Sequence, residues 1–204
     1  MRSVFVLSTR LLATHGAAKE NQMKRIVFLA GLPGVGKSTL ARKIAEKVGG
    51  SVLDIDKIKK KIVDPNLVTS TIDPPEVRWA CYEKATEEIF ALLDTGASPI
   101  IVDEVFHLQS LRQKLEILCA EKGAEILWIE VRCSYEKVEK RLRASDRKGH
   151  ILSTEEALKM NRLFEQIFEG FPDNKANCLT FNNEDDCNTG NLVPLIHEWV
   201  LGLA

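Results

Sequence analysis

The stretch GLPGVGKST, residues 31–39, decides the fold class of this chain. It follows the apolar run RIVFLA and precedes a segment with helical periodicity from Lys37 to Val48. Its spacing, Gly-x-x-x-x-Gly-Lys-Ser, is the phosphate-loop pattern in the strand–loop–helix context that this pattern requires. Glycines let successive main-chain N–H groups converge on phosphate oxygens, and the start of the following helix favours an anion. The stretch therefore predicts a nucleoside triphosphate site.

The polar residues of the stretch support this interpretation. A glycine-rich turn that only capped a helix would not need a lysine and a serine at these two positions. We expect Lys37 to neutralise the β- and γ-phosphates and the Ser38 hydroxyl to bind Mg²⁺. The residues predicted to bind the nucleotide are Gly31, Pro33, Gly34, Val35, Gly36, Lys37, Ser38 and Thr39.

Apolar strands alternate with helical segments along the rest of the chain. The predicted strands are RIVFLA, SVLDID, PIIVDE, AEILWIEV and NCLTF. This alternation predicts an α/β P-loop NTPase fold, a five-stranded parallel sheet with helices on both faces, and a small helical lid at about 143–155. Because ligands of such sheets bind at the carboxyl ends of the strands, the acids that follow the second and third strands are candidate site residues.

Length and composition favour one domain with its own core. With 204 residues, we expect a leader at 1–22, either dispensable or resembling a transit peptide, and a P-loop kinase-like domain at 23–204. The net charge of −1 argues against a globally basic nucleic-acid binder. Five scattered cysteines without a CxxC pair argue against a disulfide framework or a structural zinc site. We predict a cytoplasmic protein without a membrane span, and the sequence indicates no protein partner.

Two strand ends carry the acids that phosphoryl transfer needs. Asp56, at the end of SVLDID, is the predicted base or orienting carboxylate for an acceptor hydroxyl, and Asp54 lies two residues before it on the same strand face. The alternative is that both acids cap the following helix. Asp103, after the apolar run PIIV, is the predicted magnesium ligand together with Ser38, and Glu104 is its neighbouring alternative.

A group of arginines ends the helix after the fourth predicted strand. Arg141, Arg143 and Arg147 run into the irregular segment ASDRKGH, where a mobile lid would stand. Arginine suits the oxygens of a phosphoryl group in transfer, because its planar fork matches them. The alternative is a solvated basic helix end that interacts favourably with the helix dipole. Arg143 and Arg147 are the predicted catalytic pair. Arg141 is the alternative if the register of the pair is shifted along the chain.

Three classes of P-loop protein compete. A GTPase switch should carry an NKxD motif, but the chain has NKAN at 174–177, and Asp103 does not begin a DxxG motif. A remodelling ATPase normally needs a larger body than this chain provides. A small kinase explains the acids and the lid arginines together. A nucleotide-binding switch or a regulatory ATPase without acceptor phosphorylation is the alternative.

The chain resembles a group of small P-loop kinases that includes polynucleotide 5′-hydroxyl kinases, zeta toxins, chloramphenicol phosphotransferase and gluconate kinase. Four blocks carry the resemblance: GLPGVGKSTLARKIA, DIDKIKK, IIVDEVFHLQSLRQKLEILCAEKGA and WIEVRCSYEKVEKRLRASDR. The resemblance implies ATP and Mg²⁺ as cofactors and transfer to a hydroxyl. It matches Asp56 to the base, Arg143 and Arg147 to the lid pair, and Arg112 to an arginine after the third strand.

The chain also departs from this group. Lys59 stands where the group often has an arginine, which makes a phosphorylated acceptor such as a nucleic-acid end less favoured. The acceptor pocket is expected within 65–82, where Arg78 supplies charge and Trp79 and Tyr82 either stack on an acceptor or belong to the core. Lys59, Arg78 and Arg112 are the predicted substrate-binding residues. We thus predict an ATP- and Mg²⁺-dependent kinase for a hydroxyl of a small molecule or nucleotide-like acceptor.

Overall fold

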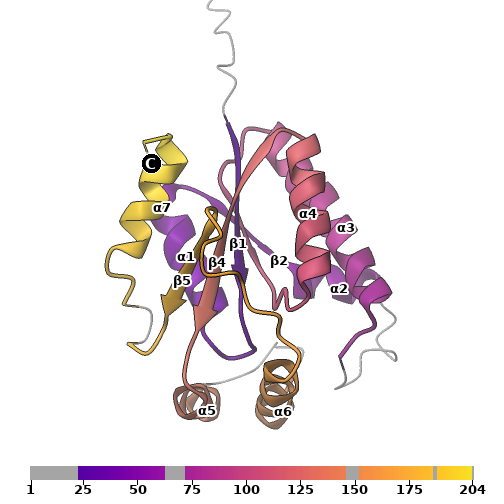
Figure 1. The fold of residues 1–204 in the computed structure, drawn as a ribbon, viewed down its shortest axis with the longest axis vertical. Helices are drawn as coiled ribbons and strands as arrows, with labels where there is room; N and C mark the ends of the chain where they lie inside the picture. Colours follow the sequence, from indigo (N-terminus) through magenta and orange to yellow (C-terminus); the bar gives the residue numbers. More distant parts are fainter. Residues whose placement is uncertain (1–22, 63–71, 146–151, 186–187, 204) are drawn as a thin grey trace, which may run out of the picture.

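A parallel sheet of five strands forms the centre of the molecule (Figure 1). The computed structural model describes residues 23–62, 72–145, 152–185 and 188–203. The strands lie in the order β2-β3-β1-β4-β5, and every pair is parallel. Their bounds are β1 Lys24–Ala30, β2 Ser51–Asp54, β3 Ile100–Asp103, β4 Ala124–Arg132 and β5 Cys178–Asn182. The predicted α/β class and five-stranded parallel sheet are confirmed.

Helices cover both faces of the sheet. They are α1 Lys37–Val48, α2 Ile55–Ile62, α3 Pro75–Asp94, α4 Gln109–Glu121, α5 Tyr135–Ala144, α6 Thr154–Glu165 and α7 Leu192–Leu201. One face packs against α2, α3 and α4, and the other against α1, α5, α6 and α7. In Figure 1, α5 and α6 lie below the carboxyl ends of the strands, where ligands of this fold bind.

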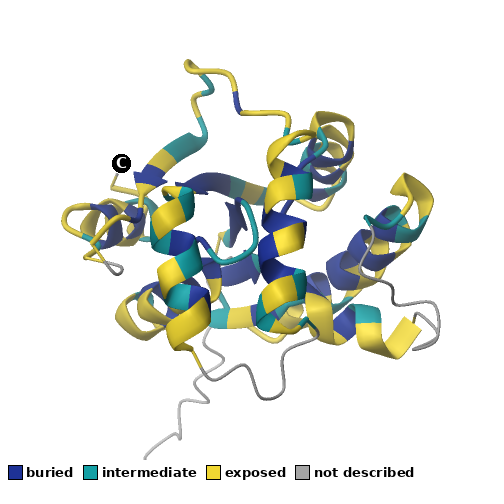
Figure 2. Ribbon diagram, turned by 90° about the horizontal axis from the view of Figure 1, so that it is seen from below, coloured by how far each residue is buried: buried dark blue, intermediate teal, exposed yellow. Residues whose placement is uncertain are grey.

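The central strand β1 shows why the core has two halves. Successive side chains of a strand point to opposite faces, so Ile26 and Phe28 enter the core under α3 and α4, whereas Val27 and Leu29 enter the core under α1 and α7. All four residues are fully or almost fully buried. Figure 2, a view from below, shows the buried strands enclosed by helices whose outer surfaces are exposed.

One boundary differs from the sequence prediction and changes the site. The second strand ends at Asp54, and α2 begins at Ile55, because the Asp54 Oδ1 atom accepts a hydrogen bond of 3.0 Å from the Asp56 main-chain N–H. Asp56 therefore lies in the first turn of a helix, and the expectation that it shares a strand face with Asp54 is wrong. The capping interpretation holds for Asp54.

A reciprocal capping box marks the start of α6. Ser153 caps this helix, and the side chains of Ser153 and Glu156 accept from each other's main-chain N–H groups. Within the described residues, no helix combines the length and the apolar character needed to cross a membrane.

Candidate active site

The loop between β1 and α1 owes its shape to glycines with positive φ angles. Gly31, Gly34 and Gly36 have φ values of 149°, 84° and 99°, a region that side chains disfavour. A Cβ atom on Gly31 would lie 2.4 Å from the Val131 carbonyl oxygen. The loop therefore needs glycine for its conformation at all three positions and for space at Gly31.

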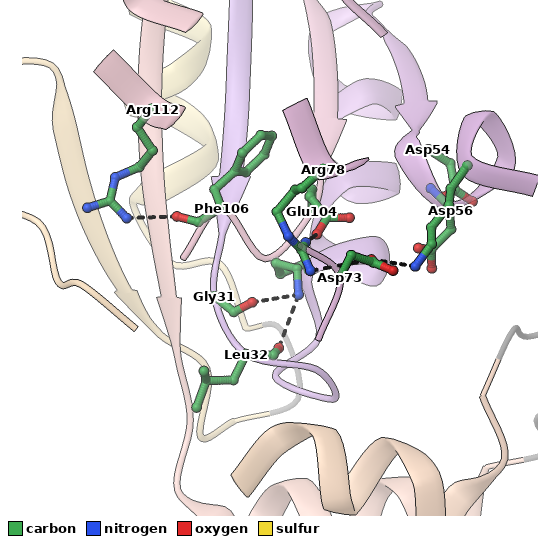
Figure 3. Close-up of polar contacts among 11 residues, drawn as sticks. Gly31, Leu32, Asp54, Asp56, Asp73, Arg78, Glu104, Phe106 and Arg112 are labelled. Carbon is green, nitrogen blue, oxygen red and sulfur yellow. Dashed lines mark hydrogen bonds and ion pairs between the residues drawn. The ribbon is translucent and has the colours of Figure 1, made fainter. Parts of the chain in front are cut away.

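Lys37 folds back onto this loop. Its Nζ atom donates to the carbonyl oxygens of Gly31 and Leu32, at 2.9 and 3.0 Å, and Figure 3 marks both hydrogen bonds with dashed lines. The residue is 8% exposed. The first turn of α1 contains no acidic residue. A cation above left-handed glycines at the start of a helix is the chemistry that binds a polyphosphate, so the residues present fit ATP.

Asp103 ends β3 beside this loop. It is paired in register with Leu29 of β1 and Asp54 of β2. Burial raises the pKa of Asp103, while the positive charge of Lys37 and a hydrogen bond with the Ser38 side chain act in the opposite direction. The two predicted magnesium ligands, Ser38 and Asp103, are thus in contact. Their oxygen atoms fit Mg²⁺, which takes its remaining ligands from phosphates and water.

Among the described residues, no group of three His, Cys, Asp or Glu side chains is arranged to hold a metal by itself.

Asp56 faces an unusually acidic environment, although the residue is exposed. Partial desolvation of the carboxyl and the negative charges of Glu104, Asp54 and Asp103 raise the pKa of Asp56 to about 7, and Lys37 opposes this shift. Water at the exposed residue screens part of these charges. A carboxyl that is partly protonated near neutral pH can accept and release a proton there, as an acid–base catalyst must.

A buried network of ion pairs lies next to Asp56. Arg78 of α3 contacts Glu104 with an N–O distance of 2.8 Å and Asp73 with one of 3.6 Å. Lys59 of α2 contacts Asp73 with an N–O distance of 2.5 Å. The Arg78 guanidinium also lies 5.3 Å from the centre of the Phe164 ring. Figure 3 shows Arg78 between Glu104 and Asp73. Two of the three predicted substrate-binding cations, Lys59 and Arg78, thus lie beside the predicted base, and each is paired with an acid.

Two further polar side chains pack against this network. Tyr82 and His107 are 1% and 2% exposed. Within the described part of the chain, the His107 Nδ1 atom has no hydrogen-bond partner, and the Tyr82 hydroxyl lies beside the Arg78 guanidinium. Burial and the charges of Arg78 and Arg112 lower the pKa of His107 to about 4, so this ring is neutral at pH 7. Tyr82 packs against Phe106, as the core alternative predicted.

Trp79 and Arg112 face other parts of the molecule. The Trp79 ring is partly buried and lies 5.1 Å from the Lys114 Nζ atom of α4. Arg112 is 3% exposed and donates to the carbonyl oxygens of Phe106 and Glu169, at 2.7 and 2.6 Å. Because its guanidinium is occupied by main-chain carbonyls, we leave Arg112 out of the proposed acceptor site.

The lid arginines differ from one another. Arg143 is exposed and pairs with Glu139 of its own helix and with Glu155 at the start of α6. Arg141 instead donates to the Asn183 carbonyl oxygen at 2.7 Å and contacts the Cys133 sulfur. This anchored role makes Arg141 a poor candidate for a mobile catalytic group. Arg147 lies outside the described residues, as does the whole of 146–151 within the predicted lid.

Two asparagines that were not predicted from the sequence donate hydrogen bonds to main-chain carbonyl oxygens of the phosphate loop. Asn161 of α6 donates to the Pro33 carbonyl oxygen, and Asn183, after β5, donates to the Val35 carbonyl oxygen, both at 2.7 Å. Both residues are almost completely buried. Their separations of 128 and 148 residues from the loop leave no local signal in the sequence. A buried polar residue on an apolar helix face was the available hint for Asn161.

The fold and the loop define a protein of the P-loop class. The family described as an AAA domain matches residues 26–167, more than half of the chain, and the chain therefore belongs to this family. Uncharacterized proteins of Mycobacterium tuberculosis and Mycobacterium bovis are 32% identical to it over 117 residues. The match covers 54% of this chain and 23% of theirs, so the chain spans about a quarter of the length of these relatives.

Solved structures of kinases share the fold. A sugar kinase of Janibacter sp. HTCC2649 superposes with a TM-score of 0.64 at 18% identity, over 89% of this chain and 96% of that one. A gluconokinase of Sinorhizobium meliloti 1021 gives 0.57 at 17% identity, over 89% and 90%. An APS kinase of Mycobacterium tuberculosis, solved with AMPPNP and APS, gives 0.59 at 18%, over 88% and 98%. The resemblance to P-loop small-molecule kinases is thus confirmed at the level of the fold.

Proposed function

We propose that this protein is an ATP-dependent kinase that transfers the γ-phosphoryl group to a hydroxyl group of a small molecule. The observation that carries the proposal is the position of Asp56. Its carboxyl interacts with Lys37 of the phosphate loop and with Asp103 at the end of β3. These interactions support Asp56 as the proton acceptor beside a phosphoryl donor bound by the loop.

Each residue of the site has a separate role in the proposed reaction. Asp56 takes the proton of the acceptor hydroxyl, whose oxygen forms the new bond to the γ-phosphorus as the bond to the β-phosphate oxygen of ATP breaks and ADP leaves. Lys37 stabilises the negative charge on the phosphate oxygens. Ser38 and Asp103 would hold Mg²⁺, which supplies further charge neutralisation when bound. Arg143 and Arg147 are the proposed lid cations, and Arg143 must first leave Glu139 and Glu155.

The test is transfer of labelled γ-phosphate from ATP to a panel of hydroxyl compounds, with products identified by mass spectrometry. We expect a phosphorylated product that depends on Mg²⁺ and on Asp56. The alternative, a nucleotide-dependent switch or regulatory ATPase, predicts hydrolysis or partner binding without any such product. Strong preference for GTP over ATP would favour the switch. The cytoplasmic location and the nucleotide-like acceptor remain predictions of the sequence.

A further inference from the structure

We define the acceptor side of the site as Asp56, Lys59, Asp73, Arg78 and Glu104. It carries more acidic than basic side chains. Once Lys37 and Asp103 are assigned to the nucleotide and its metal, the remaining acids are Asp56, Asp73 and Glu104, with Asp54 beside them. The remaining cations in the described part of this cluster are Lys59 and Arg78. Within the described residues, this side of the site therefore carries a net negative charge.

Both cations already have partners. Lys59 and Asp73 are mostly buried, with side chains 16% and 14% exposed, and the side chains of Arg78 and Glu104 are 7% and 11% exposed. A phosphate or carboxylate on the acceptor would have to displace one of these acids and leave it buried without its partner, which is costly. It would also face the remaining like charges. The residues between Ile62 and Ile72 contain no lysine or arginine that could compensate.

A buried polar atom without a partner supports contact between this network and a polar molecule. The His107 Nδ1 atom is buried at the network without a hydrogen-bond partner in the described residues, and the Tyr82 hydroxyl lies against the Arg78 guanidinium. Buried polar atoms normally have partners, supplied by protein, water or ligand. A hydroxyl group can donate to a carboxylate or to His107 and accept from Tyr82 or Arg78.

We propose that the acceptor is a polyol without negative charge, either neutral or amine-bearing, such as a sugar or an amino sugar, and that Asp73 sets this preference by neutralising Lys59. This inference rests on the proposed kinase function and names the chemical class of its acceptor. It separates the chain from kinases whose acceptor carries a phosphate or carboxylate group. The sequence prediction that Lys59 and Arg78 bind the acceptor by charge is revised accordingly, since their charges are neutralised within the protein.

The test compares four acceptors with the same carbon skeleton at constant ionic strength: glucosamine, glucose, gluconate and glucose 6-phosphate. Each is incubated with the full-length protein, ATP and Mg²⁺, and product formation is measured. We expect kcat/KM for glucosamine or glucose to exceed the values for both anions by at least about tenfold, roughly the cost of one unpaired charge at a partly solvated site. Faster transfer to gluconate or glucose 6-phosphate would overturn the proposal.

A binding measurement decides the charge preference even if none of the four compounds is converted. Calorimetry measures whether inorganic phosphate binds to protein that is saturated with Mg²⁺ and a non-hydrolysable ATP analogue. We expect no binding to the wild type and a new phosphate site in Asp73→Asn, because Lys59 then lacks its acid. Asp94→Asn is the matched control, since Asp94 pairs with Lys24 at 2.7 Å in an exposed position outside the site.

The outcomes separate the two proposals. A phosphate site in the wild type that disappears in Lys59→Met would overturn the preference for an uncharged acceptor. Absence of phosphate binding in both the wild type and Asp73→Asn would overturn the role given to Asp73. Failure of the kinase function itself would appear differently, as ATP binding without transfer to any hydroxyl compound, whatever the phosphate measurement gives.

Discussion

The phosphate loop and the acceptor side are held together in different ways. The loop takes its shape from its own main chain, with glycines at positive φ and carbonyl oxygens that accept from Lys37, Asn161 and Asn183. The acceptor side takes its shape from side-chain ion pairs that join α2, α3 and the segment after β3. Substitutions in the loop should therefore affect nucleotide binding, whereas substitutions on the acceptor side should affect transfer and stability.

The largest effect is expected from Lys37→Met. Removal of the ammonium group takes away the positive charge at the phosphates, and we expect transfer to fall by about 10³-fold or more, with a clear loss of ATP affinity. Stability should change by only about 1 kcal/mol, the net value of the lost hydrogen bonds to Gly31 and Leu32. Calorimetric titration with ATP and chemical denaturation measure the two quantities. Unchanged ATP binding would refute the role of the loop.

The next largest effect is expected from Asp56→Asn, compared with Asp54→Asn. Loss of the base should lower transfer by about 10²- to 10³-fold while ATP affinity remains close to that of the wild type. Asp54 caps α2 through the Asp56 N–H, and an asparagine amide oxygen can accept the same hydrogen bond, so Asp54→Asn should change stability by less than about 1 kcal/mol and slow transfer much less than Asp56→Asn does. If the two variants slow transfer equally, Asp56 has no special role as the base.

Lys37 and Asp56 could be predicted from the sequence, whereas the ion pairs that surround Asp56 could not. The loop follows from local spacing, because Gly31, Gly36 and Lys37 act through their own main chain and neighbours. Asp56 was found from its place after a strand, although the strand ends at Asp54. Arg78 and Lys59 were predicted as positively charged residues of the site. The acids that pair with them, Glu104 and Asp73, lie in other segments, so the sequence did not reveal the pairs.

Arg112 shows why residue type and position do not assign a partner. The resemblance to small P-loop kinases predicts Arg112 as a substrate-binding residue, but its guanidinium donates to the main-chain carbonyl oxygens of Phe106 and Glu169. Whether a buried cation meets a ligand or the protein itself depends on contacts between segments far apart in the chain. Residue type and spacing do not determine those contacts.

A third prediction compares a buried cation with an exposed one. Arg78→Met leaves Glu104 buried without its partner, and we expect a loss of about 3 kcal/mol of unfolding free energy. Arg143 is about half exposed in its pairs with Glu139 and Glu155, so Arg143→Met should cost less than about 1 kcal/mol. Urea denaturation measures both values. Equal losses would show that the Arg78 network contributes no more than a surface pair.

The raised pKa of Asp56 gives a smaller, pH-dependent effect. The folded protein holds this proton up to about pH 7, whereas the unfolded chain loses it near pH 4, so unfolding releases a proton in between. The free energy of unfolding should therefore fall as the pH rises from 4 to 7, by well under about 1 kcal/mol per unit because water screens the exposed residue. Asp56→Asn should remove this component of the slope in nucleotide-free protein. Transfer should increase over the upper part of the same range, as the base loses its proton. An identical slope in Asp56→Asn would show that other groups cause the pH dependence.

The smallest effect is expected at Asn161, which connects α6 to the phosphate loop. Asn161→Ala removes the donor to the Pro33 carbonyl oxygen and should lower stability by about 1 kcal/mol and ATP affinity by about threefold. Asn161→Asp keeps the shape but places a carboxylate against that carbonyl and near bound phosphates, so ATP affinity should fall further, by about tenfold. Asn174, an exposed residue, gives the control, because its replacement by alanine should change stability by less than about 0.5 kcal/mol. If Asn161→Asp binds ATP as well as Asn161→Ala does, the contact supports only the position of α6, and the main chain of the loop keeps its shape without it.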